Sequence, residues 1–243
     1  MAELWYASGK KHFSENEPAF FDPRQQSWAV EIENHWAELK PELDALIAEQ
    51  DKNFVSNEYI GIATNNGWSS LSFLFWGYRQ QTILKSKCPK LTAYLEKVPG
   101  LVSASLSRLA PQTTINEHRG DTNGVFRCHL GIEVPASLPE CGIRVGNEQQ
   151  GWAEGKWLFF NDAWKHSAWN KTDKRRIVLI MDVIRPEFMS KKRMICTNIL
   201  ARHVLFHYQA KNSFVKKLPY LFKGMLFVAI AMPLYLRGPK TIA

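Results

Sequence analysis

Apolar residues recur along this chain at two different spacings, and the spacing changes near Gly100. Over residues 27–51 they fall three or four positions apart, which predicts an amphipathic helix with one buried face. Pro41 lies inside this stretch, so we expect a kink there or two helices with a break. A second helix is expected over residues 88–98, because a Pro-Gly pair directly ends its pattern.

After Gly100, short runs rich in β-branched and aromatic residues are separated by Pro, Gly, Asn and Asp. The runs are VSASLSRL, VFRCHLGIEV, GIRVG, KWLFFND and RRIVLIMDVI. Closely spaced strands without intervening helices predict a β-sandwich or barrel rather than a parallel sheet. We therefore expect one domain over residues 1–188, with a helical part at about 1–100 and a β core at about 101–188.

Charge separates the last part of the chain, residues 189–243, from the rest. Of the 31 Lys and Arg residues, ten lie in this tail, which has no Asp or Glu. The first 188 residues thus hold 21 basic and 23 acidic residues, so the net charge of +8 is a property of the tail. A basic segment of this kind favours an anionic partner.

The tail also contains an uncharged apolar stretch, residues 224–236, with basic residues on both sides (Lys216, Lys217, Lys223, Arg237 and Lys240). It is shorter than the roughly 20 residues of a spanning helix, so we expect an anchor on an anionic membrane surface. The alternative is a helix that packs on the main body. Nucleic acid is not expected as a partner, because the charges flank an apolar run instead of forming a polar groove.

The four cysteines are scattered and form no CxxC pair, so neither a zinc site nor a disulfide framework is indicated. A reducing compartment follows as the default. The N-terminus lacks an apolar signal core, so export by a cleaved signal is not expected. These features favour a cytoplasmic protein at the inner face of a membrane, and they leave the oligomeric state open.

Cations occur on strand faces that are otherwise apolar. In the run VFRCHLGIEV, Arg127 and His129 share one face, while apolar side chains occupy the other. Arg176 leads a similar apolar face in the last run. If these three side chains converge, they form a site for a dicarboxylate, since a buried guanidinium needs an anion. The alternative is that each arginine reaches the rim and solvent.

Two histidines lie where the ends of strands or turns are expected. His118 falls in the turn-rich segment TTINEHRGDTNG, and His166 follows NDAWK after the KWLFF run. Neutral imidazole is a good ligand for Fe(II), and two such residues facing one cavity would form a metal site. A histidine in a loop is more often simply solvated, so spacing alone does not decide between these interpretations.

Together these blocks resemble the aspartyl/asparaginyl β-hydroxylase family of Fe(II)- and 2-oxoglutarate-dependent oxygenases. The resemblance lies in SLSRLAPQTTINEHRGDTN, FRCHLGIEVP, IRVGNEQQGWAEGKWLFFNDAWKHSAWN and RRIVLIMDVIRPEF, and extends more weakly to NNGWSSLSFLFWGYR. It covers roughly residues 20–190 and fades in the tail. It implies a mainly β protein with flanking helices and a double-stranded β-helix (jelly-roll, cupin-like) core.

The resemblance also implies roles for single residues. His118 and His166 would be the iron ligands, and Arg176 would hold the distal carboxylate of 2-oxoglutarate with Ser107 as a hydroxyl partner. Arg127 and His129 would line the same cosubstrate pocket. No catalytic residue beyond the metal centre is implied.

Such oxygenases usually have a carboxylate ligand two residues after the first histidine. Here that position is Gly120, a departure that the family shares, so the site is expected to have two protein ligands. A water fills the vacant position in this interpretation. Asp121 is one residue further on, within reach of that water in this interpretation, and we do not count it as a ligand.

The resemblance implies a dioxygenase that consumes 2-oxoglutarate and O₂ and hydroxylates an unactivated C–H bond. A basic, apolar tail favours a lipid substrate, such as a fatty acyl chain of a membrane lipid. The alternative is β-hydroxylation of an Asp or Asn residue in a peptide or a small metabolite. An alternative of another class is a cupin-like binding protein without turnover.

Overall fold

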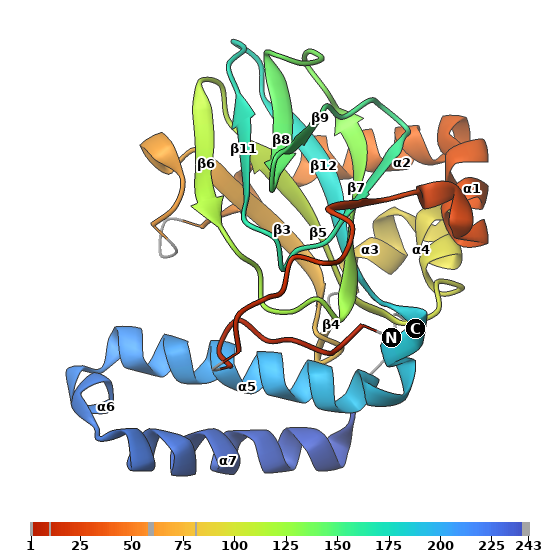
Figure 1. Ribbon diagram of the computed structural model, residues 1–243. Helices are drawn as coiled ribbons and strands as arrows, with labels where there is room; N and C mark the ends of the chain where they lie inside the picture. The colour runs from red at the N-terminus through yellow and green to blue at the C-terminus, as the bar shows by residue number, and fades with distance from the viewer. Residues whose placement is uncertain (1, 10, 58–60, 81, 240–243) are drawn as a thin grey trace.

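A computed structural model describes residues 2–9, 11–57, 61–80 and 82–239 of the protein. Two antiparallel sheets face one another and form its centre (Figure 1). The larger sheet has the order β1-β10-β7-β12-β5-β3-β2, with β4 paired to β3, and the smaller sheet has the order β6-β11-β8-β9. This arrangement confirms the expected mainly β, double-stranded β-helix class.

The strands have the following bounds: β1 Phe20–Phe21, β2 Val55–Ser56, β3 Trp68–Phe75, β4 Arg79–Gln80, β5 Leu101–Leu109, β6 Thr113–His118, β7 Val125–Glu133, β8 Cys141–Val145, β9 Glu148–Gln150, β10 Trp157–Phe160, β11 His166–Asn170 and β12 Arg176–Ile184. The five runs that predicted strands correspond to β5, β7, β8, β10 and β12. β6 lies in a segment that we expected to be turn-rich. Its outer side chains, such as Glu117, face solvent, so the strand lacks a strong apolar signal.

We expected the region before residue 100 to be helical, but it also contains strands of the larger sheet. β3 contributes eight residues to the larger sheet, where it lies beside β5. Its side chains alternate between half-buried and buried over most of its length, the period-two pattern of a strand. The sheet that carries the site therefore begins well before the expected core.

The helices have the following bounds: α1 Ser27–Asn34, α2 Trp36–Gln50, α3 Ile83–Lys87, α4 Pro89–Leu95, α5 Lys192–Lys211, α6 Ser213–Lys217 and α7 Tyr220–Arg237. The expected second helix over residues 88–98 corresponds to α4. The expected kink or break at Pro41 is wrong in its position, because the helices separate at His35 and Pro41 lies inside α2. Pro41 lacks the backbone N–H that would donate a hydrogen bond in the second turn of α2. Burial of one face of the helix offsets this loss, and that face continues across the proline as Leu39, Leu43, Leu46 and Ile47.

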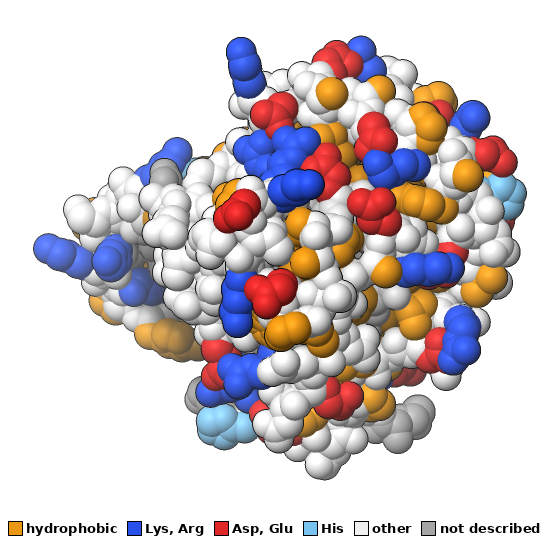
Figure 2. Space-filling model, turned by 90° about the horizontal axis from the view of Figure 1, so that it is seen from above, with side chains coloured by type: hydrophobic (Ala, Val, Ile, Leu, Met, Phe, Trp, Pro, Cys, Tyr) orange, Lys and Arg blue, Asp and Glu red, His pale blue; other side chains and the backbone are white. Residues whose placement is uncertain are grey.

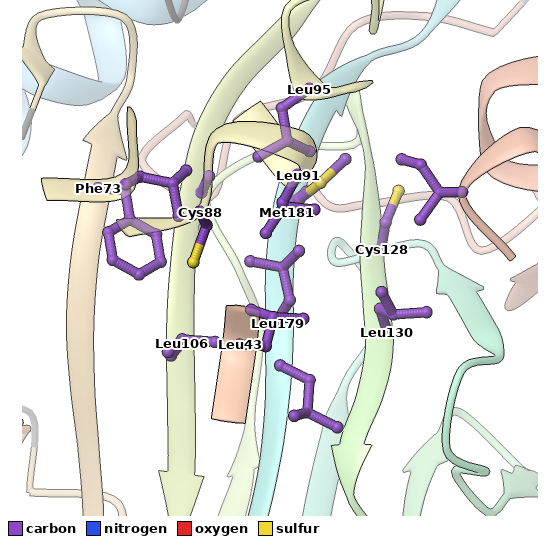
Figure 3. Packing of buried hydrophobic residues seen from close by; sticks show 14 of the residues in the cluster. Leu43, Phe73, Cys88, Leu91, Leu95, Leu106, Cys128, Leu130, Leu179 and Met181 are labelled. Carbon is purple, nitrogen blue, oxygen red and sulfur yellow. The ribbon is translucent and has the colours of Figure 1, made fainter. Parts of the chain in front are cut away.

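The largest apolar cluster lies between the outer face of the larger sheet and the helices of the first hundred residues. Figure 3 shows part of it, with Leu43 of α2 and Leu91 and Leu95 of α4 near side chains of the central strands β5, β7 and β12. A carboxylate also ties α2 to α4, since Glu42 accepts hydrogen bonds from the backbone N–H groups of Lys90 and Leu91, each at 3.2 Å. This packing holds the larger sheet in place from outside.

A second apolar cluster lies between the two sheets, and a third lies at one end of the body. The third cluster includes α5, whose residues Ile195, Cys196, Ile199 and Leu200 are buried against the sheet residues Val102, Val125 and Ile184. The first part of the expected tail is therefore packed on the body. α7 runs back along α5 on the far side, and none of its residues is buried (Figure 1).

Candidate active site

The two histidines meet across the smaller sheet. His118 ends β6, His166 begins β11, and the antiparallel register pairs them directly. Their ring centroids are 4.2 Å apart. The segment around His118, which we expected to be a turn, is therefore a strand. Its pairing with β11 brings together two histidines that are far apart in sequence.

Both imidazole rings are held in one tautomer. Nδ1 of His118 donates to the carbonyl oxygen of Asn116 at 2.8 Å, and Nδ1 of His166 donates to that of Trp164 at 2.9 Å. Each ring therefore presents an unprotonated Nε2. Burial lowers the pKa of His118 and lowers that of His166 well below its ordinary value, so both rings are neutral at neutral pH. Two neutral imidazoles side by side are a suitable donor pair for Fe(II).

A carboxylate from another segment lies where the usual third ligand would be. Gly120 donates its backbone N–H to the carbonyl oxygen of Asp162 at 2.7 Å, and the Asp162 carboxylate fills the space beside the glycine. Oδ1 of Asp162 lies 3.5 Å from Nε2 of His166. Across the described ranges, no three His, Cys, Asp or Glu residues are grouped so as to hold a metal ion. The donor set is two histidines with an acid close by.

Arg127 projects from β7 toward this acid and forms two ion pairs. Its guanidinium lies 2.9 Å from Asp162 and 2.8 Å from Asp182. Burial alone would lower the pKa of Arg127, but the two carboxylates raise it above its ordinary value. Burial raises the pKa of both Asp162 and Asp182. Two buried carboxylates face one guanidinium, so a divalent cation at the histidines would offset the excess negative charge.

Arg176 is the contrasting case, because it is buried without an acid. Its side chain is 1% exposed, and among the described residues no Asp or Glu lies within ion-pairing distance. It donates a long bond of 3.4 Å to the carbonyl oxygen of Ser107 and lies 4.5 Å from the Trp152 ring, while its Nε has no partner. Burial lowers the pKa of Arg176 to about 10. An anion in the pocket would satisfy this cation.

His129 lies between the two arginines along the larger sheet. Its Nδ1 accepts a hydrogen bond from the indole N–H of Trp152 at 3.3 Å, and its Nε2 is buried without a partner. Burial lowers the pKa of His129 well below its ordinary value, and the neighbouring arginines lower it further. Because Nδ1 accepts, Nε2 carries the proton of the neutral ring and is a donor that points to no protein group.

Ser107 completes the group on the side of Arg176. It is 1% exposed, and its hydroxyl oxygen accepts a bond from the indole N–H of Trp68 at 3.0 Å. The hydroxyl proton remains free for an acceptor in the pocket.

The structure brings all six candidate residues of the sequence analysis into one pocket between the two sheets. Its lining is Trp68, Ser107, Ile115, His118, Arg127, His129, Ile143, Phe160, His166, Ala168, Arg176 and Ile180. The expected strand faces are as observed, since Arg127 and His129 face the pocket and Cys128, Leu130 and Ile132 belong to the outer core.

Sequence reasoning missed four residues that shape this pocket. Asp162 and Asp182 neutralise Arg127, which we had expected to be available to a dicarboxylate, and Trp68 and Trp152 hold Ser107 and His129. Asp162 precedes His166 by four residues, a spacing that was visible but carries little meaning alone. Trp152 lies in an irregular segment, where no periodic pattern places a side chain.

The chain is similar in sequence to several known proteins. Residues 33–186 match a family model described as aspartyl/asparaginyl beta-hydroxylase. An ornithine lipid ester-linked acyl 2-hydroxylase of Rhizobium tropici is 36% identical over 173 residues, 70% of this chain and 61% of that protein. The aspartyl/asparaginyl beta-hydroxylase of Homo sapiens is 29% identical over 167 residues, 67% of this chain and 22% of that protein. The chain thus matches less than two thirds of either relative's length.

Among solved structures, a viral collagen prolyl hydroxylase from Paramecium Bursaria Chlorella virus-1, in complex with 2OG, aligns with a TM-score of 0.39. It is 12% identical, and the alignment covers 59% of this chain and 90% of that chain. A predicted oxalate decarboxylase from Thermotoga maritima aligns with a TM-score of 0.31 at 13% identity, covering 49% of this chain and 81% of that one.

Proposed function

This chain belongs to the aspartyl/asparaginyl β-hydroxylase family, and from that premise we propose that it is an Fe(II)- and 2-oxoglutarate-dependent dioxygenase. It hydroxylates an unactivated C–H bond. His118 and His166 hold the iron through Nε2, and the rest of the pocket holds the cosubstrate. Fe(II) and 2-oxoglutarate together supply the activation of O₂ that oxidation of such a bond requires.

The observation that carries the proposal is the contrast between the two buried arginines of the pocket. Arg127 already has two carboxylate partners, whereas Arg176 has none among the described residues. A protein keeps a buried, unpaired guanidinium at a cost in stability, and a ligand carboxylate removes that cost. Arg176 therefore binds the distal carboxylate of 2-oxoglutarate, and the Ser107 hydroxyl donates to the same group.

His129 and Arg127 have different parts in this proposal. The free Nε2–H of His129 donates to the cosubstrate between Arg176 and the histidine pair. Arg127 lines the pocket, and its ion pairs orient Asp162 beside His166. The apolar residues of the pocket, such as Ile143 and Phe160, exclude water from the reacting centre.

For the substrate, we propose a fatty acyl chain of a membrane lipid. The relative from Rhizobium tropici acts on an ornithine lipid, as its name says, and this chain has a tail suited to a membrane. α7 is long and apolar enough to cross a membrane by length and composition, and none of its residues is buried in the body. An anchor lying on the surface fits better, because α7 packs along α5, which is itself fixed in the body.

Charge supports an anionic membrane as the partner of the tail. No acidic residue occurs after residue 188, whereas basic residues from Lys191 to Arg237 are distributed along the hairpin that α5 and α7 form. Lys240, which we expected to flank the apolar stretch, lies outside the described residues. On the side of the body away from the hairpin, acidic and basic side chains are intermixed (Figure 2). Docking through residues 189–243 would place the enzyme at the inner, cytoplasmic face of a membrane.

A second candidate is β-hydroxylation of an Asp or Asn side chain in a peptide or metabolite, which the name of the human relative favours. The test is a comparison of cells with and without the gene by mass spectrometry of lipids and of peptides. We expect a 16 Da difference in an acyl chain, and purified protein that turns over 2-oxoglutarate only with Fe(II). A 16 Da difference in Asp or Asn residues alone would favour the second candidate. Absence of turnover with either substrate class would leave a cupin-like binding protein.

A further inference from the structure

The histidine pair lies at an end of the pocket that borders half-buried residues. His166, His129 and Arg176 are buried, whereas His118 and the following residues Arg119, Gly120 and Asp121 are half-buried. The same end of the barrel lies toward the hairpin of α5 and α7 (Figure 1). The segment 119–123, here called the ligand loop, therefore separates the metal site from the tail.

The ligand loop is held from two sides. Toward the N-terminus, the backbone N–H of Ala7 donates to the carbonyl oxygen of Asp121 at 2.9 Å, and that of Trp5 donates to Oδ1 of Asn123 at 2.7 Å. Toward the tail, Nε2 of His203 on α5 lies 3.0 Å from Oδ2 of Asp121. His203 thus connects α5 to the ligand loop.

The His203 ring is oriented by more than this one contact. It packs edge-on against Phe75 at the end of β3, with ring centroids 5.3 Å apart. The body thus contacts the ring twice, once from β3 and once from the ligand loop. An exposed ion pair between mobile side chains contributes little, but a ring held by a second group keeps its partner in one place.

A short chain of contacts leads from His203 to the histidine pair. Asp121 contacts His203, the adjacent Gly120 is bonded through its N–H to Asp162, and Asp162 lies beside His166. We propose that His203 is a positioning residue for the metal site, so that α5 of the tail is part of the active-site architecture. The proposal rests on the proposed metal-binding function, and it extends that function to a residue outside the β core.

Cobalt(II) binding to the full-length protein tests the proposal. Its absorption spectrum reports metal affinity and ligand geometry without any turnover. We expect His203→Ala to weaken cobalt binding by about tenfold, the lower end of the effect of residues that support metal ligands. His203→Gln should restore most of the affinity, because its amide can donate to Asp121. His207→Ala, one turn further along the exposed part of α5, is the matched control and should bind like the parent protein.

A double-mutant cycle separates positioning from a general loss of stability. Asp121→Ala and His203→Ala together should weaken cobalt binding no more than either alone, because both break the same contact. If His203→Ala does not fold, cobalt binding to Asp121→Ala tests the same contact through the other partner. Parent protein that binds no cobalt would overturn the proposed function. Parent protein that binds it, with both variants equal to His207→Ala, would overturn the role of His203 alone.

Discussion

A Cβ atom on Gly120 would lie 1.4 Å from Oδ2 of Asp162, so residue 120 has no room for a side chain. The usual carboxylate ligand two residues after the first histidine is therefore excluded by another acid, which belongs to the turn between β10 and β11. Residue 120 thus cannot supply a third ligand, because the Asp162 carboxylate occupies the space that its side chain would need.

The first prediction follows from this lack of space. Gly120→Ala should lower the free energy of unfolding by about 1–3 kcal/mol and weaken metal binding, because Asp162 must move away. Adding Asp162→Ala should recover part of the lost stability. Gly224→Ala is the control, because an added Cβ there meets nothing within 4 Å. Urea unfolding of the four proteins measures the effect, and equal losses for Gly120→Ala and Gly224→Ala would contradict it.

Replacement of Arg176 by methionine should separate stability from function. Without its ligand the variant should be as stable as the parent or more stable by about 1–4 kcal/mol, because a buried unpaired cation is removed. Stabilisation by 2-oxoglutarate should disappear, whereas the parent gains about 2.7 kcal/mol at 100 times its Kd. Thermal unfolding with and without 2-oxoglutarate measures both effects.

Arg175→Ala is the control for this experiment. Arg175 faces away from the pocket and pairs with Glu133 at 2.7 Å and with Asp51. The variant should keep the 2-oxoglutarate shift. A shift that survives in Arg176→Met would mean that another residue holds the distal carboxylate.

The stability of the metal-free protein should fall in acid because of buried neutral histidines. Burial lowers the pKa of His129 well below 6.5, so the unfolded chain binds a proton there that the native ring does not. Above about pH 6.5 this ring costs the native state nothing by titration. Below that pH the free energy of unfolding decreases by about 1.4 kcal/mol per pH unit because of it. Urea unfolding from pH 7.5 to 5.0 should give a shallower decrease for His129→Gln than for His207→Gln. Identical slopes would show that the His129 site is hydrated.

Membrane docking should depend on one face of α7. Five exposed apolar residues recur there at helical spacing: Leu221, Met225, Val228, Met232 and Leu236. Met225→Glu with Met232→Glu should weaken sedimentation with phosphatidylglycerol vesicles at least about tenfold, since each charge near an anionic surface is worth about 1 kcal/mol and insertion is also lost. Val55→Glu changes an equally exposed apolar residue on β2 and should have no effect. Parent protein that ignores these vesicles at low salt would contradict membrane docking.

The sequence predicted those parts of the fold in which one face of an element is buried. Period-two alternation identified β7 and β12, and with them the pocket-facing Arg127, His129 and Arg176. β6 and β11 belong to the smaller sheet, and the exposed Asn116 and Glu117 of β6 weaken its apolar pattern, while β11 has polar residues at both of its ends. Side-chain partners such as Asp162 depend on how distant turns meet, which no local pattern encodes.

The tail shows the same limit. Charge marks residue 189 as a boundary, yet packing continues through α5 because Ile195 and Ile199 fill the third apolar cluster. A chain that ends at residue 188 would expose that cluster, so removal of the tail for a membrane experiment should start after α5. The composition of a segment indicates which partners it favours, but it does not show where the hydrophobic core of the protein ends.

The β10–β11 turn contributes Asp162, β11 begins with His166 beside it, and β6 ends with His118. The proposed metal site is thus assembled from the ends of two neighbouring segments, and the β8–β9 hairpin flanks it. Insertions or exchanges in that hairpin could reshape the outer wall of the pocket while the ligands stay in register. The chemistry and the specificity of such a barrel can therefore evolve on separate pieces of backbone.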